Sequence, residues 1–177
     1  MFRLFRRGAP EREIGRALYK CTVKQARLPE FFTRFAAEDT IDGRFDLLAL
    51  HGFVVMEALK GCGKDGERIG SHLATAIFES LEEALRELGS ADIGISRRIK
   101  SMADAFYGRL AAYSSARNES EMKDALVRNL YRGKTDRNDE AWLLARYAFE
   151  SLQSLRTPNA KLELLKGNLV FAPLPLK

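Results

Sequence analysis

The chain has 177 residues and a formal net charge of +5, with 46% hydrophobic and 30% charged residues. This length favours one domain with one core, and the hydrophobic content excludes an intrinsically disordered chain. No apolar run approaches the ~20 residues that a membrane-spanning helix needs. Two cysteines, Cys21 and Cys62, are too few for a disulfide framework and are expected to be small buried side chains, which favours a reducing compartment.

The excess positive charge lies at the N-terminal end: residues 1–27 carry +6, and the rest of the chain carries −1. Residues 1–10 are expected to be a basic, flexible terminus, since they lack the apolar segment and cleavage site of a secretory signal. A first helix is predicted over residues 11–27.

Basic side chains recur on this helix at steps of three or four residues, so they share one face. Apolar residues such as Ile14 and Leu18 fall on a different face, with the spacing of a buried side. The basic face predicts docking to ribosomal RNA, acidic lipid headgroups or an acidic protein, and a merely solvated face is the alternative. We call this set the basic stripe: Arg12, Arg16, Lys20, Lys24 and Arg27.

A short turn after Pro29 leads to a second long helix, predicted over residues 44–60. It is apolar on nearly every side, which predicts a central place in the core. His51 within it is expected to be a satisfied core histidine and not a metal ligand. The glycine-rich segment 61–66 is predicted to be a loop, and it lacks the Walker pattern of a phosphate-binding loop.

Amphipathic spacing predicts the remaining helices. The tail, residues 169–177, is apolar and punctuated by prolines, so it should run extended across a groove of the same molecule or onto a partner. The predicted fold is an all-α, irregular single-domain bundle of six or seven helices, with the helical domain over residues 11–168. The later helices are expected at 68–88, 95–113, 118–132, 138–156 and 159–166.

No local arrangement of side chains indicates catalysis. His51 and His72 each lack a second ligand at metal spacing, and nothing signals a nucleophile. No helix-turn-helix, zinc-finger or RNA-recognition motif is present, so sequence-specific nucleic-acid binding is not expected. We expect a non-enzymatic protein without a cofactor or metal, and an enzyme whose site forms only in three dimensions is the alternative.

Two segments carry a distinctive combination of residues. The first is Asp39-Thr40-Ile41-Asp42-Gly43-Arg44-Phe45-Asp46, which runs into residues 47–51; the second is residues 86–100, followed by Ala105-Phe106-Tyr107-Gly108-Arg109 and Tyr113. With Leu18-Tyr19 and Gln25-Ala26-Arg27, they resemble the ubiquinol–cytochrome c chaperone family over about residues 15–115. Ser90-Ala91-Asp92 departs slightly from the family pattern.

The resemblance implies a non-enzymatic chaperone that holds newly made cytochrome b before it enters the cytochrome bc1 complex. It implies a protein client as partner, with the ribosome or an anionic membrane surface as further docking sites. The expected location is the bacterial cytoplasm, including the surface of the inner membrane. The competing function is a peripheral protein that binds anionic lipid through the basic stripe.

Six residues of these segments are candidate partner contacts: Asp42, Arg44, Asp46, Asp92, Tyr107 and Arg109. Asp42 and Asp92 each precede a predicted helix, and the alternative role of each is an N-cap that accepts hydrogen bonds from free amides.

The other four candidates also have alternatives. Arg44 and Asp46 lie one turn into a helix, so a salt bridge with each other or with a neighbour is expected. Tyr107 and Arg109 fall off the core-facing stripe of their helix and are expected to be exposed, and both residue types are enriched at binding hot spots.

Overall fold

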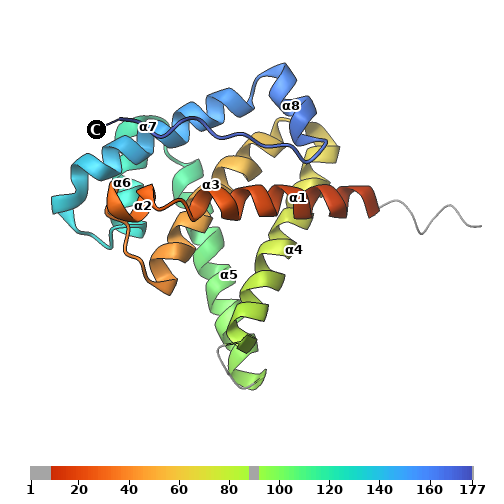
Figure 1. Cartoon of the computed structure of the whole chain (residues 1–177), viewed down its shortest axis with the longest axis horizontal. Coiled ribbons are helices and arrows are strands. Elements are labelled where there is room, and N and C mark those ends of the chain that lie inside the picture. Colours follow the sequence, from red (N-terminus) through yellow and green to blue (C-terminus); the bar gives the residue numbers. More distant parts are fainter. Residues whose placement is uncertain (1–8, 88–91, 177) are drawn as a thin grey trace, which may run out of the picture.

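The computed structural model describes residues 9–87 and 92–176, and these ranges form helices and connections without any strand (Figure 1). This confirms the predicted all-α, single-domain bundle, in which the short turn after Pro29 is the one-turn helix α2. The elements are α1 (Ala9–Ala26), α2 (Glu30–Thr33), α3 (Ile41–Lys60), α4 (Gly63–Glu87), α5 (Asp92–Ser114), α6 (Glu119–Asn129), the 3-10 helix η1 (Thr135–Arg137), α7 (Asn138–Leu155) and α8 (Pro158–Leu164).

Helix α3 forms the centre of the core, as its apolar composition predicted. It packs against α1, α4, α5, α7 and α8, and side chains on different sides of it, including Leu47, Leu50 and Val55, have no exposed surface. Each such side chain contributes about 1.5–3 kcal/mol through burial. The other helices are therefore arranged around α3.

The connection from α3 to α4 is much shorter than the predicted loop 61–66, because Gly61 and Cys62 alone join the two helices. Gly63 has a φ of +66°, which turns the chain sharply at the start of α4. Gly66 lies inside α4 against α3, where an added Cβ would stand 2.0 Å from the carbonyl oxygen of Leu59. These glycines serve a tight turn and a close helix contact instead of a flexible loop.

Helices α4 and α5 form a long pair that extends away from the rest of the bundle (Figure 1). The expected end of the helix predicted over residues 68–88 lies outside the described residues, as do residues 1–8 of the predicted flexible terminus; Ala9 and Pro10 already belong to α1. Helix α1 crosses α4 closely, since a Cβ on Gly15 would stand 2.7 Å from the Cβ of His72.

The C-terminal tail lies on the same molecule, which decides between the two predicted alternatives. After Gly167, which has a φ of +87°, residues 168–176 run back along α7 towards α2 (Figure 1). The amide of Ala172 donates to Ser151 Oγ at 3.2 Å, and Arg34 Nη2 donates to the carbonyl of Pro175 at 2.7 Å. The tail therefore forms an extended strap over the helices.

Cys21 and Cys62 are free thiols. Both are partly exposed, so the prediction that they are buried is wrong; Cys21 lies on α1, and Cys62 lies in the short connection between α3 and α4. Within residues 9–87 and 92–176, no helix is both long and apolar enough to cross a membrane.

Candidate functional site

Four residues of the basic stripe lie on the solvent-facing side of α1, Arg27 directly follows the helix, and all five side chains are exposed. The opposite side of α1 packs on α3 and α4. Arg16 Nη2 lies 3.5 Å from Glu79 Oε2 of α4, and both side chains are more than half exposed. Such a pair contributes only about 0–1 kcal/mol. The stripe is thus available for contact, and its docking role stays a prediction.

Thr40, not Asp42, is the N-cap of α3. Thr40 Oγ1 accepts a hydrogen bond from the amide of Gly43 at 3.1 Å, and Thr40 has an extended backbone. Asp42 already lies in the first turn with its side chain 71% exposed. The predicted cap is wrong by two residues because a threonine hydroxyl can satisfy a free amide much as a carboxylate does. The helix consequently begins at Ile41.

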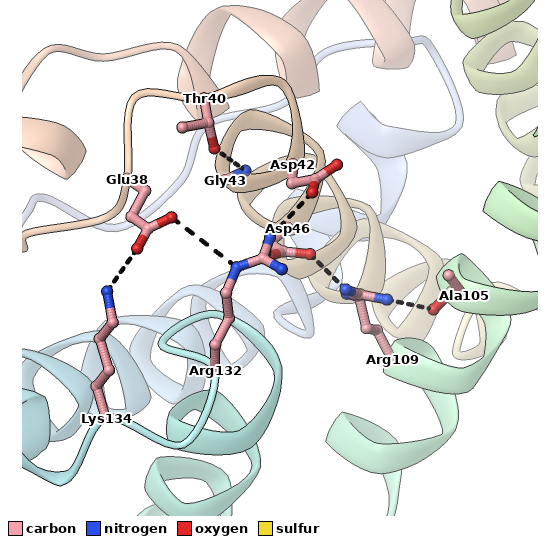
Figure 2. A network of polar contacts seen from close by, with 9 residues as sticks. All are labelled: Glu38, Thr40, Asp42, Gly43, Asp46, Ala105, Arg109, Arg132 and Lys134. Carbon is pink, nitrogen blue, oxygen red and sulfur yellow. Dashed lines mark hydrogen bonds and ion pairs between the residues drawn. The ribbon is translucent and has the colours of Figure 1, made fainter.

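Asp46 is the buried centre of a charged network (Figure 2). Its Oδ1 lies 2.6 Å from Nη2 of Arg109 on α5, and its Oδ2 lies 3.4 Å from Nη2 of Arg132, which follows α6. Arg109 also donates from Nη1 to the carbonyl of Ala105 at 3.0 Å. A carboxylate without exposed surface needs such partners, because an unpaired buried charge is strongly unfavourable. The network therefore ties α3 to two distant parts of the chain.

Arg132 extends this network to the surface (Figure 2). Its φ of +54° is followed by +79° at Gly133, so two left-handed residues turn the chain after α6. Its guanidinium lies 3.6 Å from Asp42 and 4.0 Å from Glu38, and Lys134 Nζ lies 2.6 Å from Glu38. Sequence reasoning missed Arg132 and Lys134. The available signal was Gly133, since a glycine that follows a helix often takes the left-handed conformation and marks a sharp turn of the chain.

Burial raises the pKa of Asp46 to about 6 despite its two guanidinium partners. The carboxylate is fully enclosed, whereas Arg109 is 18% and Arg132 42% exposed, so water weakens the attraction of both arginines. Burial, and then the nearby charge of Asp46, also raise the pKa of Tyr113 on α5. The charged groups here stand at the boundary between the core and solvent.

Arg44 and Asp46 do not pair with each other, because side chains two residues apart do not face one another on a helix. Arg44 Nε instead donates to Asp39 Oδ1 at 2.7 Å, and its guanidinium carbon lies 5.8 Å from the ring centre of Phe32. The hydrogen bond from Arg44 lowers the pKa of Asp39. Of the two expected options, the neighbouring salt bridge is the one that forms.

Tyr107 is 51% exposed, as expected. The expectation that Arg109 is exposed is wrong, since its side chain is 18% exposed and its guanidinium carbon lies 5.2 Å from the ring centre of Phe45. A long side chain at the edge of the core-facing stripe can turn its charged end inward towards Asp46. Asp92 is the first residue of α5, and its side chain lies outside the described part; its role stays a prediction.

A mainly apolar groove of about 460 Å³ lies between α3, α4 and α5, and we call it the α3–α5 groove. Small residues of α4, such as Gly70 and Ala74, form one wall of the groove, and Tyr107 lies at its rim. Glu57, Lys60 and Glu67 also line it, so the groove is edged by acid with one lysine. An apolar groove of this kind suits an apolar helix from a partner. Its lining includes Phe53, Met56, Gly70, Ala74, Tyr107 and Leu110.

His51 is a satisfied core histidine, which confirms its predicted role. It has no exposed surface, and burial lowers its pKa to about 4, so the ring is neutral. Nδ1 lies 2.7 Å from the Leu47 carbonyl, to which it can donate, and Nε2 lies 3.1 Å from the Tyr147 hydroxyl, from which it can accept. Phe171 of the tail packs on the ring at 5.2 Å between centres.

Among the residues that the structure places, no group of three or more His, Cys, Asp or Glu side chains could hold a metal ion.

The chain matches the model of one protein family, described as ubiquinol-cytochrome C chaperone, over residues 33–171. A crystal structure described as the Cbp3 homolog from Brucella abortus has the same fold, with a TM-score of 0.82 and 30% sequence identity. That match covers 97% of this chain and 96% of the Brucella chain.

Three vertebrate relatives are described as ubiquinol-cytochrome c reductase complex assembly factor 1. The Xenopus laevis protein is 25% identical over 159 residues, which cover 89% of this chain and 80% of that protein. The Mus musculus and Homo sapiens proteins are each 23% identical over 159 residues, which cover 54% and 53% of those proteins. The chain thus spans about half the length of the two mammalian relatives.

Proposed function

We propose that this chain, which belongs to the ubiquinol-cytochrome C chaperone family, holds newly made cytochrome b during assembly of the cytochrome bc1 complex. The observation that carries the proposal is the family match over residues 33–171. The shared fold with the Brucella protein and the names of the vertebrate relatives as assembly factors support it. The proposed role is non-enzymatic, because the client is bound and released without any covalent change.

We place the client in the α3–α5 groove. Cytochrome b exposes apolar helices and basic loops before it is assembled, and the groove offers an apolar floor with Glu57 and Glu67 at its edge. Gly70 and Ala74 leave room for the backbone of an incoming helix to approach closely. Tyr107 on the rim supplies the kind of exposed aromatic side chain that dominates many binding interfaces.

Affinity purification from the native bacterium tests both parts of this proposal. Tagged protein is crosslinked mildly, extracted in detergent and analysed by mass spectrometry. We expect cytochrome b with the wild type, and its loss with Tyr107→Glu in the groove. The matched control is Trp142→Glu on α7, because Trp142 is another exposed aromatic residue, at 42%, and does not line the groove.

Each result has a separate meaning, provided that circular dichroism shows both variants folded. Absence of cytochrome b from the wild-type sample contradicts the chaperone proposal itself. Retention of cytochrome b by Tyr107→Glu at the wild-type level contradicts the α3–α5 groove as its binding site while leaving the client unchanged.

The exposure of the basic stripe favours a second function, in which the chain docks on an anionic membrane surface. Several exposed cations on one helix face are attracted to acidic headgroups, and the attraction weakens as salt screens it. In this proposal the stripe brings the chaperone to the place where cytochrome b enters the inner membrane. The exposure of the same stripe also supports the alternative that binding of anionic lipid is the whole function of the chain.

Vesicle flotation tests this second function. Reversal of Arg12, Arg16, Lys20 and Lys24 to Glu should abolish binding to vesicles that contain phosphatidylglycerol and leave the fold intact. The control reverses Arg97, Arg98, Lys100 and Arg128, four exposed cations on α5 and α6, to Glu, which changes the net charge equally. Equal losses of vesicle binding in the two variants would contradict a specific role of the stripe. Equally strong binding of the wild-type protein to neutral and to anionic vesicles would contradict it as well.

A further inference from the structure

A second cavity of about 250 Å³ lies between α1, α3, α4 and α5 and shares no lining residue with the α3–α5 groove. We call it the α1–α4 crevice. Its two uncharged polar side chains, Tyr19 and Ser80, are hydrogen-bonded to each other. Most of its lining is apolar and includes Val23, Ala26, Leu48, Ile77, Leu81 and Met102.

The charged side chains that line the crevice are two arginines, Arg27 and Arg44, and no acidic residue lines it. Both arginines are exposed. Nε of Arg44 donates a hydrogen bond to Asp39, so the two terminal nitrogens of its guanidinium remain available to a ligand. Arg27 has no ion-pair partner among residues 9–87 and 92–176. The crevice is therefore apolar inside and cationic at its mouth.

We propose that the α1–α4 crevice binds a long-chain amphipathic anion, with the alkyl chain inside and the carboxylate or phosphate head at Arg27 and Arg44. The lining disfavours a small hydrated anion such as free phosphate, because it is mostly apolar and its two hydroxyl groups are bonded to each other, so they do not replace the water of the anion. The absence of an acidic lining residue disfavours a cationic amphiphile.

The size of the crevice agrees with one chain and not with a whole lipid. Pockets that enclose a drug-sized ligand measure about 300–1,000 Å³, and this cavity is smaller, at about 250 Å³. Ile41 on its rim is 55% exposed, so a chain longer than the cavity would continue over an apolar surface. Arg27 also belongs to the basic stripe, which places the mouth on the side of α1 that carries the cations.

Isothermal titration calorimetry with dodecanoate below its critical micelle concentration tests the proposal on the purified chain. We expect one binding site per chain. The cation dodecyltrimethylammonium, which has the same alkyl chain, should bind at least about tenfold more weakly, as loss of a charge-assisted contact predicts. Dodecyl phosphate as a third probe separates the two sources of the anion, since a preference for it indicates a single-chain lipid with a phosphate head and a preference for dodecanoate indicates a free fatty acid.

Three variants locate the binding. Ala84→Trp places a large side chain at an exposed lining position and should abolish dodecanoate binding. Arg27→Gln should weaken binding roughly tenfold. Arg12→Gln changes an exposed arginine of α1 that does not line the crevice, and it should leave binding unchanged.

Three results would overturn the proposal: no binding of dodecanoate or dodecyl phosphate to folded protein, equal binding of the cationic amphiphile, or undiminished binding by Ala84→Trp. The outcome is independent of the chaperone proposal, because the probe is a free ligand. Cytochrome b recovered with Ala84→Trp at the wild-type level would additionally separate this site from the client groove.

Discussion

Oδ1 of Asp46 lies 2.6 Å from Nη2 of Arg109, so a buried ion pair joins the start of α3 to α5. The two ends differ in their access to water, because Asp46 has no exposed surface and Arg109 is 18% exposed. Both residues lie in the segments that resemble the chaperone family, and the pair holds α5 against α3 (Figure 2).

Removal of Arg109 should destabilise the chain more than removal of Asp46. Arg109→Met leaves a fully buried carboxylate with Arg132 alone, and we expect a loss of about 3–5 kcal/mol in the free energy of unfolding. Asp46→Asn leaves an arginine that can still reach water, so its loss should be smaller. Urea denaturation measures both, and the double variant should lose less than the two single losses combined.

The exposed pair of Arg44 and Asp39 supplies the control for this cycle. Arg44→Gln should cost no more than about 1 kcal/mol, because both side chains are 56% exposed. A loss for Arg109→Met as small as this would mean that the buried pair does not hold α5 to α3.

Two buried groups should give opposite pH dependences of stability over the same range. The pKa of Asp46 is raised from 3.8 to about 6, so the folded state binds the extra proton and the free energy of unfolding falls as pH rises from about 4 to 6. The pKa of His51 is lowered from 6.5 to about 4, so the unfolded state binds the extra proton and stability rises with pH. Each effect is on the order of 3 kcal/mol.

Single variants should separate the two slopes, which nearly cancel in the wild type. Asp46→Asn should gain stability from pH 4 to 6.5, and His51→Gln should lose stability over that interval. Urea denaturation of each variant at several pH values measures the slopes. Slopes of the same sign in the two variants would contradict the assignment.

The identity of the α3 cap can be tested with two neighbouring substitutions. Thr40→Ala removes the acceptor for the Gly43 amide and should lower the free energy of unfolding by about 1 kcal/mol. Asp42→Ala removes an exposed side chain that pairs with Arg132 at 3.6 Å and should cost less than about 0.5 kcal/mol. The reverse order in thermal or urea denaturation would restore Asp42 as the cap.

Two glycines of α4 should respond oppositely to alanine. In Gly66→Ala the new Cβ would meet the Leu59 carbonyl oxygen at 2.0 Å, which forces α3 and α4 apart, so the melting temperature should fall by several degrees. At Gly70 the nearest atom is Leu59 Cδ1 at 3.9 Å, and alanine should stabilise the helix by up to about 1 kcal/mol. Equal responses would show that the two helices do not approach as closely as described.

The local sequence pattern determined most of the helices and the central place of α3. Hydrophobic spacing reports which side of a helix is buried, so it also predicted the exposed basic stripe and the buried His51. Helix boundaries were less accurate at positions 40–43 and 61–66, because several residue types can cap a helix and a glycine can serve either a loop or a close contact.

The tertiary structure alone decided which charged residues meet. Helical spacing placed Arg109 at an exposed edge, and only the packing of α5 on α3 turned it towards Asp46. The same holds for Arg132, whose left-handed backbone directs it to Asp42 and Asp46, and for the tail, whose groove is formed by helices distant in the chain. Periodicity describes each helix by itself, whereas ion pairs and grooves depend on how separate helices are positioned in three dimensions.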